Sequence, residues 1–243
     1  MKRTIVADYD EMSRTAADRV AATLRRTPNC ALCLPTGNSP VGMFKVLIER
    51  IKSGEVDASQ AQFFLLDEYI GLDDNDPDSL TGWLMNAFLR PAGIPARNIH
   101  ELPTKSIDLA AAAKAYEAEL QTFGGYELAV LGLGGNGHIA YNEPGSTADS
   151  RTRVLTLTEE SIEQARGYFH GRTVPTEAMS AGVATLLEAR SIVLIVSGAN
   201  KAEVLRGALE GEPTPDNPAS FLQLASDRVE VIADKVAAAL LST

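Results

Sequence analysis

The sequence predicts an α/β fold with a doubly wound, mostly parallel sheet and helices on both faces, a Rossmann-like three-layer sandwich. Short apolar or β-branched runs alternate with helical patterns from one end of the chain to the other. The run Ile192–Val196 shows no polar alternation, which is typical of a strand covered by helices on both sides. A length of 243 residues suits one large α/β domain, so residues 1–243 are expected to form a single domain.

Strands are expected where short runs of Val, Ile, Leu, Phe or Ala end at a turn residue or a charge. The run before Pro35 and the run before Gly198 are examples, since each stops at a residue that favours a turn. In chain order the expected strands are Thr4–Ala7, Ala31–Pro35, Gln62–Leu66, Leu128–Gly132, Ile192–Ser197 and Val229–Ala233.

Helices are expected where apolar residues recur with a period of three to four. Ser39 is expected to cap the second helix, with Pro40 at its first position. In chain order the expected helices are Glu11–Arg26, Pro40–Ser53, Leu109–Phe123, Thr176–Ala189, Lys201–Glu210 and Lys235–Leu241. The long segment Gly134–Arg151 has neither pattern, and a segment of that length is more often a functional loop than a plain connection.

The charge balance argues against several classes of partner. The chain has 22 basic and 32 acidic residues, a net charge of −10, so it lacks the positive field that nucleic acid or an anionic membrane would attract. No apolar stretch approaches the roughly 18 residues of a membrane span. An anionic ligand would therefore need a local site that overrides the global charge.

The two cysteines, Cys30 and Cys33, lie in the apolar stretch Cys30–Leu34, which includes an expected strand. Residues three apart in a strand point to opposite faces, so a pair of buried thiols is favoured over a shared metal site. The chain has only three histidines and no second cysteine pair to complete a zinc site. Reduced cysteines and the absence of a leader-like start indicate a cytoplasmic protein.

The turn Thr36–Ser39 follows a strand and precedes a helix. Free backbone N–H groups and the positive end of the helix dipole meet at such a turn, which favours an anion such as phosphate. The turn lacks the lysine of a P-loop and the glycine spacing of a dinucleotide fingerprint. A plain capped turn would have the same sequence, so this segment alone leaves both interpretations open.

Two further segments follow strands. Asp67 comes directly after the apolar run Gln62–Leu66, where a carboxylate would be partly desolvated and able to act as a base. In the loop Gly132–Gly145, four glycines precede His138, with Asn136 before it and Glu143 after it. A histidine with a carboxylate and an amide at this spacing indicates proton transfer.

Taken together, five segments resemble the glucosamine-6-phosphate deaminases, also called isomerases, in the order that this family has them. The related 6-phosphogluconolactonases share the fold and a Gly-His loop but lack the continuation Asn142-Glu143-Pro144. The matching segments are Pro35–Pro40, Leu66–Leu72, Gly137–Pro144, Ser150–Arg153 and Val174–Pro175.

The resemblance implies a role for each candidate residue. Asp67 would be the base that moves a proton between C1 and C2 of the opened sugar. His138 would act at the ring oxygen during opening, supported by Glu143 and Asn136. The phosphate would lie on Thr36, Gly37, Asn38 and Ser39, with Lys201 as its cation. Family members also use an arginine before a Phe-Phe pair, and Arg166 is displaced from that position by one residue.

The resemblance therefore implies one catalytic domain that converts glucosamine 6-phosphate and water to fructose 6-phosphate and ammonia in amino-sugar catabolism. This chemistry needs proton transfers but no electron sink, so neither a cofactor nor a metal is expected. A galactosamine-6-phosphate deaminase remains the nearest alternative, and a lactonase the next. A phosphosugar-sensing protein without turnover is disfavoured by the intact set Asp67, His138 and Glu143. The sequence leaves monomer and homo-oligomer equally open.

Overall fold

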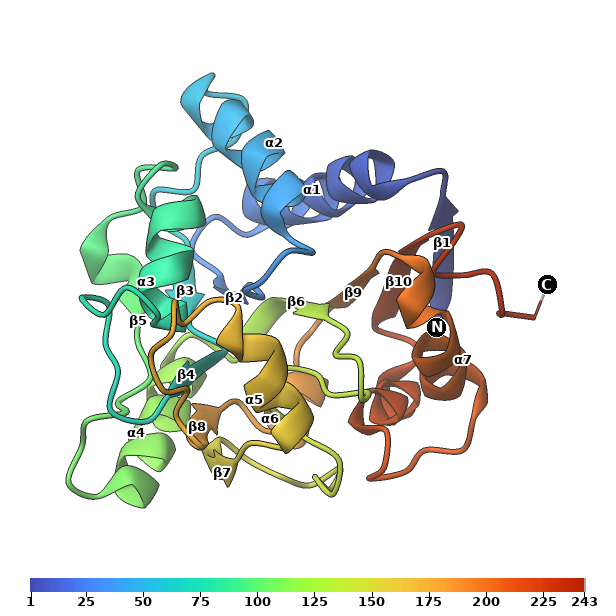
Figure 1. Ribbon diagram of the computed structural model, residues 1–243. Coiled ribbons are helices and arrows are strands. Elements are labelled where there is room, and N and C mark those ends of the chain that lie inside the picture. The colour runs from blue at the N-terminus through green and yellow to red at the C-terminus, as the bar shows by residue number, and fades with distance from the viewer. Residues whose placement is uncertain (243) are drawn as a thin grey trace.

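The computed structural model, which describes residues 1–242, has a central sheet of seven strands in the order β1-β10-β9-β6-β2-β3-β5 (Figure 1). Every pairing in this sheet is parallel. The predicted doubly wound, mostly parallel sheet is thus confirmed. A smaller antiparallel sheet, β4-β8-β7, lies beside it.

The strands of both sheets are short. The six expected strands correspond to β1, β2, β3, β6, β9 and β10, each with bounds within two residues of those expected, whereas β4, β5, β7 and β8 were not expected. The strands are β1 (Lys2–Val6), β2 (Ala31–Cys33), β3 (Gln62–Phe64), β4 (Asp67–Tyr69), β5 (Ile99–His100), β6 (Tyr126–Gly132), β7 (Arg153–Thr156), β8 (Glu177–Ser180), β9 (Ile192–Val196) and β10 (Val229–Asp234).

Helices occupy the connections between the strands. The α-helices are α1 (Tyr9–Arg26), α2 (Val41–Lys52), α3 (Leu80–Leu84), α4 (Leu109–Thr122), α5 (Glu159–Arg166), α6 (Val183–Leu187) and α7 (Ala202–Glu210). A π-helical turn, η1 (Met85–Leu89), extends α3, and three 3-10 helices complete the set: η2 (Ala96–Asn98), η3 (Ala199–Lys201) and η4 (Pro218–Ala225).

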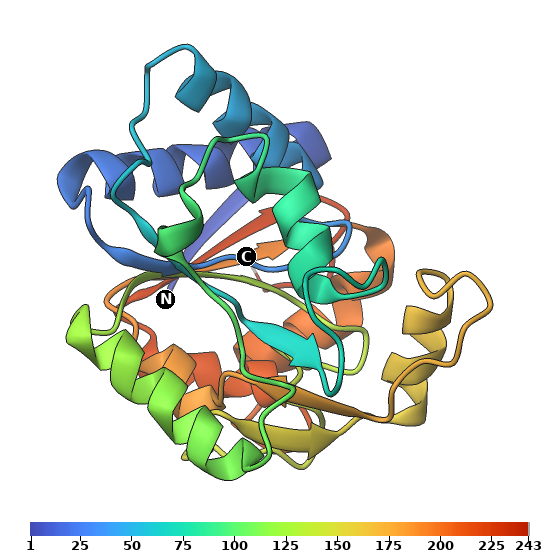
Figure 2. The same ribbon diagram turned by 90° about the vertical axis from the view of Figure 1, so that its left-hand side faces the viewer.

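The two faces of the large sheet each have their own apolar core. On one face, α1, α2 and the segment from α3 to η1 pack against alternate strand residues such as Leu32 and Val130. On the other face, α4, α6, α7 and η4 pack against residues such as Cys33 and Leu131. Figure 2 shows the sheet nearly edge-on between these two helical layers. Cys30 and Cys33 belong to different cores, as their spacing predicts, and both are buried.

The helix expected at Thr176–Ala189 is wrong. Its first part is the strand β8, which pairs with β4 on one side and β7 on the other, and only Val183–Leu187 is helical. Hydrogen bonds on both edges of β8 outweigh the local helical pattern. At Gly182, between β8 and α6, a Cβ atom would lie 2.1 Å from the carbonyl oxygen of Ser150, so only glycine fits there without a shift.

The helix expected at Lys235–Leu241 is also wrong, because the segment forms consecutive turns. The side chain of Asp234 accepts the N–H of Ala237 at 2.8 Å and the hydroxyl of Ser197 at 2.5 Å. A segment of seven residues has little helical stability of its own, so this tertiary anchoring decides its shape.

The strand order has a switch point beside β2. The chain runs outward from β2 to β3 and β5 and then returns to β6 on the opposite side of β2. The loops after β2 and β6 therefore leave in opposite directions and open a crevice at the carboxyl ends of these strands. Ligands of doubly wound folds bind in such a crevice. Among residues 1–242, no helix is long and apolar enough to cross a membrane.

Candidate active site

A cavity of about 470 Å³ lies at the carboxyl ends of β9, β6, β2 and β3, which are neighbours in the sheet. Each of these strands sends a loop to the cavity, so residues distant in sequence meet there. The lining includes Thr36, Gly37, Asn38, Ser39, Asp67, Gly134, His138, Tyr141, Gln164, Tyr168, Asn200 and Lys201. The structure thus brings the predicted turn, the predicted base, the predicted histidine and the predicted lysine to one place.

The turn Thr36–Ser39 connects β2 to α2. Gly37 has a φ of +86°, a left-handed conformation that glycine adopts without strain. Ser39 is not the N-cap that we expected: α2 begins at Val41 after Pro40, and no side chain caps its start. Instead the hydroxyl of Tyr9, from α1, accepts the N–H of Gly42 at 2.9 Å and donates to the carbonyl of Asn38 at 3.0 Å.

Asp67 is the first residue of β4 in the small sheet, three residues after the end of β3 in the large sheet. Its side chain lines the cavity but is only 7% exposed, and its Oδ1 accepts no hydrogen bond from any described residue. Burial, with a further contribution from the negative charge of Glu68, raises the pKa of Asp67 from 3.8 to about 7. A carboxyl that exchanges its proton near neutral pH suits general acid-base catalysis.

In the loop after β6, the imidazole of His138 packs directly against the backbone of Gly134. A Cβ atom at Gly134 would lie 2.2 Å from Cδ2 of His138, so glycine is needed there for the imidazole to occupy its place. The N–H of Gly134 donates to the carbonyl of His138 at 2.9 Å and closes the loop. The glycine at position 134 is therefore explained by the space that the imidazole ring of His138 occupies.

His138, Glu143 and Asn136 form one group. Nδ1 of His138 lies 3.4 Å from Oε2 of Glu143, and Nδ2 of Asn136 donates to the same Oε2 at 2.8 Å. Burial opposes ionisation of Glu143, but the hydrogen bonds from His138, Ser161 and Asn136 outweigh it and lower its pKa to about 2. Glu143 is therefore a stable anion beside the imidazole. Asn136 also accepts the backbone N–H of His138 at 3.1 Å, so it orients the carboxylate and the loop.

Lys201 ends the short helix η3, directly before α7. Lys201 lines the same cavity as the Thr36–Ser39 turn, and no carboxylate of residues 1–242 forms an ion pair with it. Burial lowers the pKa of Lys201, and Glu160 opposes this change. A half-buried cation beside free backbone N–H groups can hold an anion.

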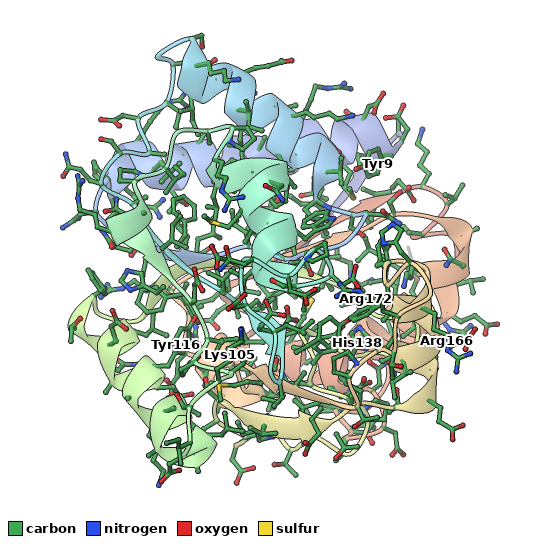
Figure 3. All side chains as sticks on the ribbon, turned by 60° about the vertical axis from the view of Figure 1, so that its left-hand side comes forward. Tyr9, Lys105, Tyr116, His138, Arg166 and Arg172 are labelled. Carbon is green, nitrogen blue, oxygen red and sulfur yellow. The ribbon has the colours of Figure 1, made fainter. Side chains whose placement is uncertain are left out.

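Arg166 is the one predicted residue that neither lines the cavity nor contacts the group around His138. Its guanidinium pairs with Glu163 at 3.0 Å, and both side chains are about two-thirds exposed. Figure 3 shows Arg166 at the periphery of the molecule, outside the region around His138. Any anion in the cavity would meet Lys201 without help from this arginine in the observed arrangement.

Sequence reasoning missed the helix α5, which covers one side of the cavity with Gln164 and, just beyond its end, Tyr168. Thr158 caps this helix by accepting the N–H of Ser161 at 3.2 Å, and Glu159 and Glu160 occupy its first turn. A threonine followed by two acidic residues is a recognised helix start, so the signal was present. A second cavity of about 480 Å³ adjoins the first, and its lining includes the aromatic side chains of Tyr69, Trp83 and Phe169.

This arrangement offers two separate groups that can transfer protons to a molecule in the cavity. Asp67 offers a carboxyl that titrates near neutral pH, and His138 offers a ring nitrogen held against an anion. The turn and Lys201 provide a separate place for a negatively charged group. A small anionic substrate with an acidic C–H bond and a protonatable oxygen would use all of these elements.

Comparisons with known proteins agree with this geometry. A family described as glucosamine-6-phosphate isomerases/6-phosphogluconolactonase matches residues 7–231. A glucosamine-6-phosphate deaminase of Thermoanaerobacter sp. (strain X514) is 40% identical over 242 residues, which cover 99% of this chain and 95% of that protein. A glucosamine-6-phosphate deaminase of Rhodopirellula baltica is 41% identical over 239 residues, covering 98% of this chain and 94% of that protein.

Solved structures show the same fold. A monomeric glucosamine-6-phosphate deaminase superimposes with a TM-score of 0.93 at 34% identity, covering 99% of this chain and 100% of that chain. The 6-phosphogluconolactonase of Trypanosoma brucei superimposes with a TM-score of 0.77 at 20% identity, covering 99% of this chain and 98% of that one. The second likeness concerns the fold alone.

Proposed function

The chain belongs to the glucosamine-6-phosphate isomerase and 6-phosphogluconolactonase family, and we propose that within it the chain is a glucosamine-6-phosphate deaminase. It converts glucosamine 6-phosphate and water to fructose 6-phosphate and ammonia. Full-length relatives with this name, at 36 to 41% identity, support the assignment. The predicted deaminase family and enzyme class are confirmed at this level.

The proposed roles of the site residues follow the chemistry of the substrate. His138 moves the proton that opens the sugar ring, transferring it to the ring oxygen, while Glu143 stabilises the imidazole when it is charged. Asp67 removes the proton from C2 and returns it to C1 through an enol-type intermediate. Water then adds at C2, and ammonia leaves. Asn136 keeps the Glu143 carboxylate and the loop in position through its two hydrogen bonds.

One observation carries this proposal most strongly. Asp67 and His138 line the same cavity from different loops, and the pKa of Asp67 is raised to about 7 by burial and by Glu68. A base poised near neutral pH, with a second proton-transfer group across one small cavity, suits an aldose-ketose isomerisation. The turn Thr36–Ser39 and Lys201 are proposed to hold the phosphate, which supplies binding energy away from the reacting carbons.

Ammonia release is the direct test. The purified protein, without added metal or nucleotide, should release ammonia from glucosamine 6-phosphate, and galactosamine 6-phosphate should be measured in parallel. Faster release from galactosamine 6-phosphate would reassign the preference at C4. Hydrolysis of 6-phosphogluconolactone without ammonia release from either amino sugar would overturn the proposal in favour of the lactonase.

Lys201→Ala should weaken substrate binding while leaving kcat nearly unchanged, because a phosphate contact forms in the ground state and in the transition state alike. Loss of one charged contact is worth about 1.5–3 kcal/mol, so KM should rise about tenfold to a hundredfold. Lys45→Ala, which removes an exposed lysine of α2 outside the cavity, is the matched control. An unchanged KM in a folded Lys201→Ala protein would remove Lys201 from the phosphate site.

The remaining assignments are also proposals. Residues 1–243 act as one catalytic domain in the cytoplasm, and the partner is a small phosphosugar rather than nucleic acid or a membrane. Strands from the two chain ends, β1 and β10, pair with each other along one edge of the sheet that carries the site, which supports the single domain. Size-exclusion chromatography with light scattering would decide between monomer and homo-oligomer.

A further inference from the structure

Glu68 follows Asp67 on β4, and the mechanism above does not use it as a reacting group. Neighbouring residues of a strand point to opposite faces, so Asp67 faces the catalytic cavity while Glu68 lines a separate recess behind the strand. Glu68 is only 1% exposed. A buried carboxyl directly behind the catalytic base requires a physical explanation.

The carboxylate of Glu68 accepts four hydrogen bonds. Its Oε1 accepts the N–H of Tyr69 at 2.8 Å and the N–H of Leu80 at 3.1 Å. Its Oε2 accepts the hydroxyl of Ser79 at 3.0 Å and the N–H of Thr81 at 2.8 Å. All four partners donate and none accepts, which matches an ionised side chain that is an acceptor only. The bonds fix a negative charge at this position.

These hydrogen bonds also connect β4 to the start of α3. Ser79 caps α3 by accepting the N–H of Gly82 at 2.8 Å, and Glu68 takes the next free donors of the first turn. Ser79, Leu80 and Trp83 line the aromatic cavity that adjoins the catalytic one. One carboxylate therefore fixes both the strand of the catalytic base and a wall of the adjoining cavity.

No described cation neutralises this pair of acidic residues directly. Lysines and arginines of residues 1–242 make no ion pair with Asp67 or Glu68, and Lys105, which lines the recess of Glu68, pairs with Asp73. The titratable groups that surround the two carboxyls are Cys33 of β2, Tyr69, Tyr116 of α4, Tyr141, His138 and Lys201 on the side of Asp67, and Asp73, Asp74, Glu101 and Lys105 on the side of Glu68.

We propose that Glu68 is a positioning residue for the deaminase reaction: its fixed negative charge behind β4 keeps Asp67 a strong base, and its four hydrogen bonds hold β4 against α3. This proposal rests on the proposed deaminase function only where it is tested by kinetics. Glu68 does not touch the substrate. It acts through Asp67, because a like charge nearby opposes ionisation of the base and so strengthens its hold on the proton.

The test is the pH profile of kcat/KM for Glu68→Gln. Glutamine keeps the shape but removes the charge, so Asp67 should ionise more readily and the acidic limb of the profile should move to lower pH. A single nearby charge in a partly buried site shifts a pKa by about half a unit to one unit. A weaker base should also lower the plateau of kcat/KM, by about threefold.

Ser79→Ala is the matched control for stability. It removes one donor to Glu68 and the cap of α3 but keeps the charge, so it should destabilise the fold without moving the acidic limb. A folded Glu68→Gln protein whose limb coincides with that of the wild type would overturn the proposal and leave Glu68 as a helix cap only. If Glu68→Gln does not fold, Ser106→Lys replaces it, because Ser106 lines the same recess and a lysine there opposes the charge of Glu68.

Ser106→Lys should move the limb in the same direction by a smaller amount, and an unmoved limb in that folded variant would equally overturn the proposal. Failure of the proposed function is distinguishable, since the wild type would then release no ammonia. In that case ¹³C NMR of labelled aspartate follows the Asp67 carboxyl directly, with Asp67→Asn to assign its signal. A downward shift of its titration in Glu68→Gln would support the role of Glu68 without any activity.

Discussion

Asp67→Asn should abolish turnover while substrate still binds. The amide has the size of the carboxyl but cannot take the proton from C2, so the loss should appear in kcat, by about 10²-fold to 10⁴-fold. The dissociation constant for glucosamine 6-phosphate should change little, because the phosphate is held elsewhere in the cavity by the proposed contacts. Steady-state kinetics and calorimetric titration of the inactive variant measure the two quantities separately.

The same substitution should stabilise the fold at neutral and higher pH. The pKa of Asp67 is raised from 3.8 to about 7, so the folded state holds a proton that the unfolded chain releases in this range. Stability contributed by the protonated form is therefore lost as pH rises from 3.8 through 7. Asparagine has no such loss, and its advantage in Tm over the wild type should grow across that range.

Asp57→Asn is the control for Asp67→Asn, because Asp57 lies outside the catalytic cavity and its carboxyl is exposed. It should leave kcat at the wild-type value. Near-native kcat in a folded Asp67→Asn protein would refute the role of Asp67 as the base, and an equal Tm difference at pH 4 and pH 8 would refute its raised pKa.

The parallel sheet was predictable because its inner strands are buried on both faces. Runs such as Ile192–Val196 contain only apolar residues, and each run is followed by a loop at the same edge of the sheet. The small antiparallel sheet was not predictable in this way. β4 contains Asp67 and Glu68, and β8 continues into a helical pattern, so neither resembles a buried strand. Their pairing depends on partners distant in sequence.

The candidate site was predictable where the backbone itself imposes a residue type. Gly134 leaves space for the His138 ring, and Gly37 adopts a positive φ, so each position favours glycine and can be recognised from the sequence. Contacts between side chains on separate elements leave no such trace. The hydrogen bonds of Tyr9 to the loop after β2 and the four bonds of Glu68 became evident only from the structure.

Arg166 shows that the position of a residue along the chain does not by itself predict where its side chain points. It is one residue away from the place where the family has its arginine, and one residue on a helix turns a side chain by about 100°. In the structure its side chain lies in solvent beside Glu163.

Glu143→Gln should lower kcat about tenfold to a hundredfold, since it keeps the histidine but removes part of a proton-transfer contribution of about 10²-fold to 10⁴-fold. The carboxylate lies 3.4 Å from Nδ1 of His138 and accepts Nδ2 of Asn136 at 2.8 Å. A neutral amide cannot stabilise the imidazole in its charged form, so ring opening should slow. KM should change less than kcat, because Glu143 does not line the cavity that holds the substrate.

The same variant has a defined effect on acid stability. The pKa of Glu143 is lowered from 4.5 to about 2, so its ionised form stabilises the fold above 4.5, and this contribution is lost as pH falls toward 2. Glu143→Gln should therefore be less stable than the wild type at pH 7, with a difference that shrinks as pH falls from 4.5 to 3. Urea unfolding at several pH values measures this, with Glu163→Gln, an exposed glutamate of α5, as the control. A stability difference that is constant with pH, together with a normal kcat, would mean that Glu143 is an ordinary loop residue without a functional bond to His138.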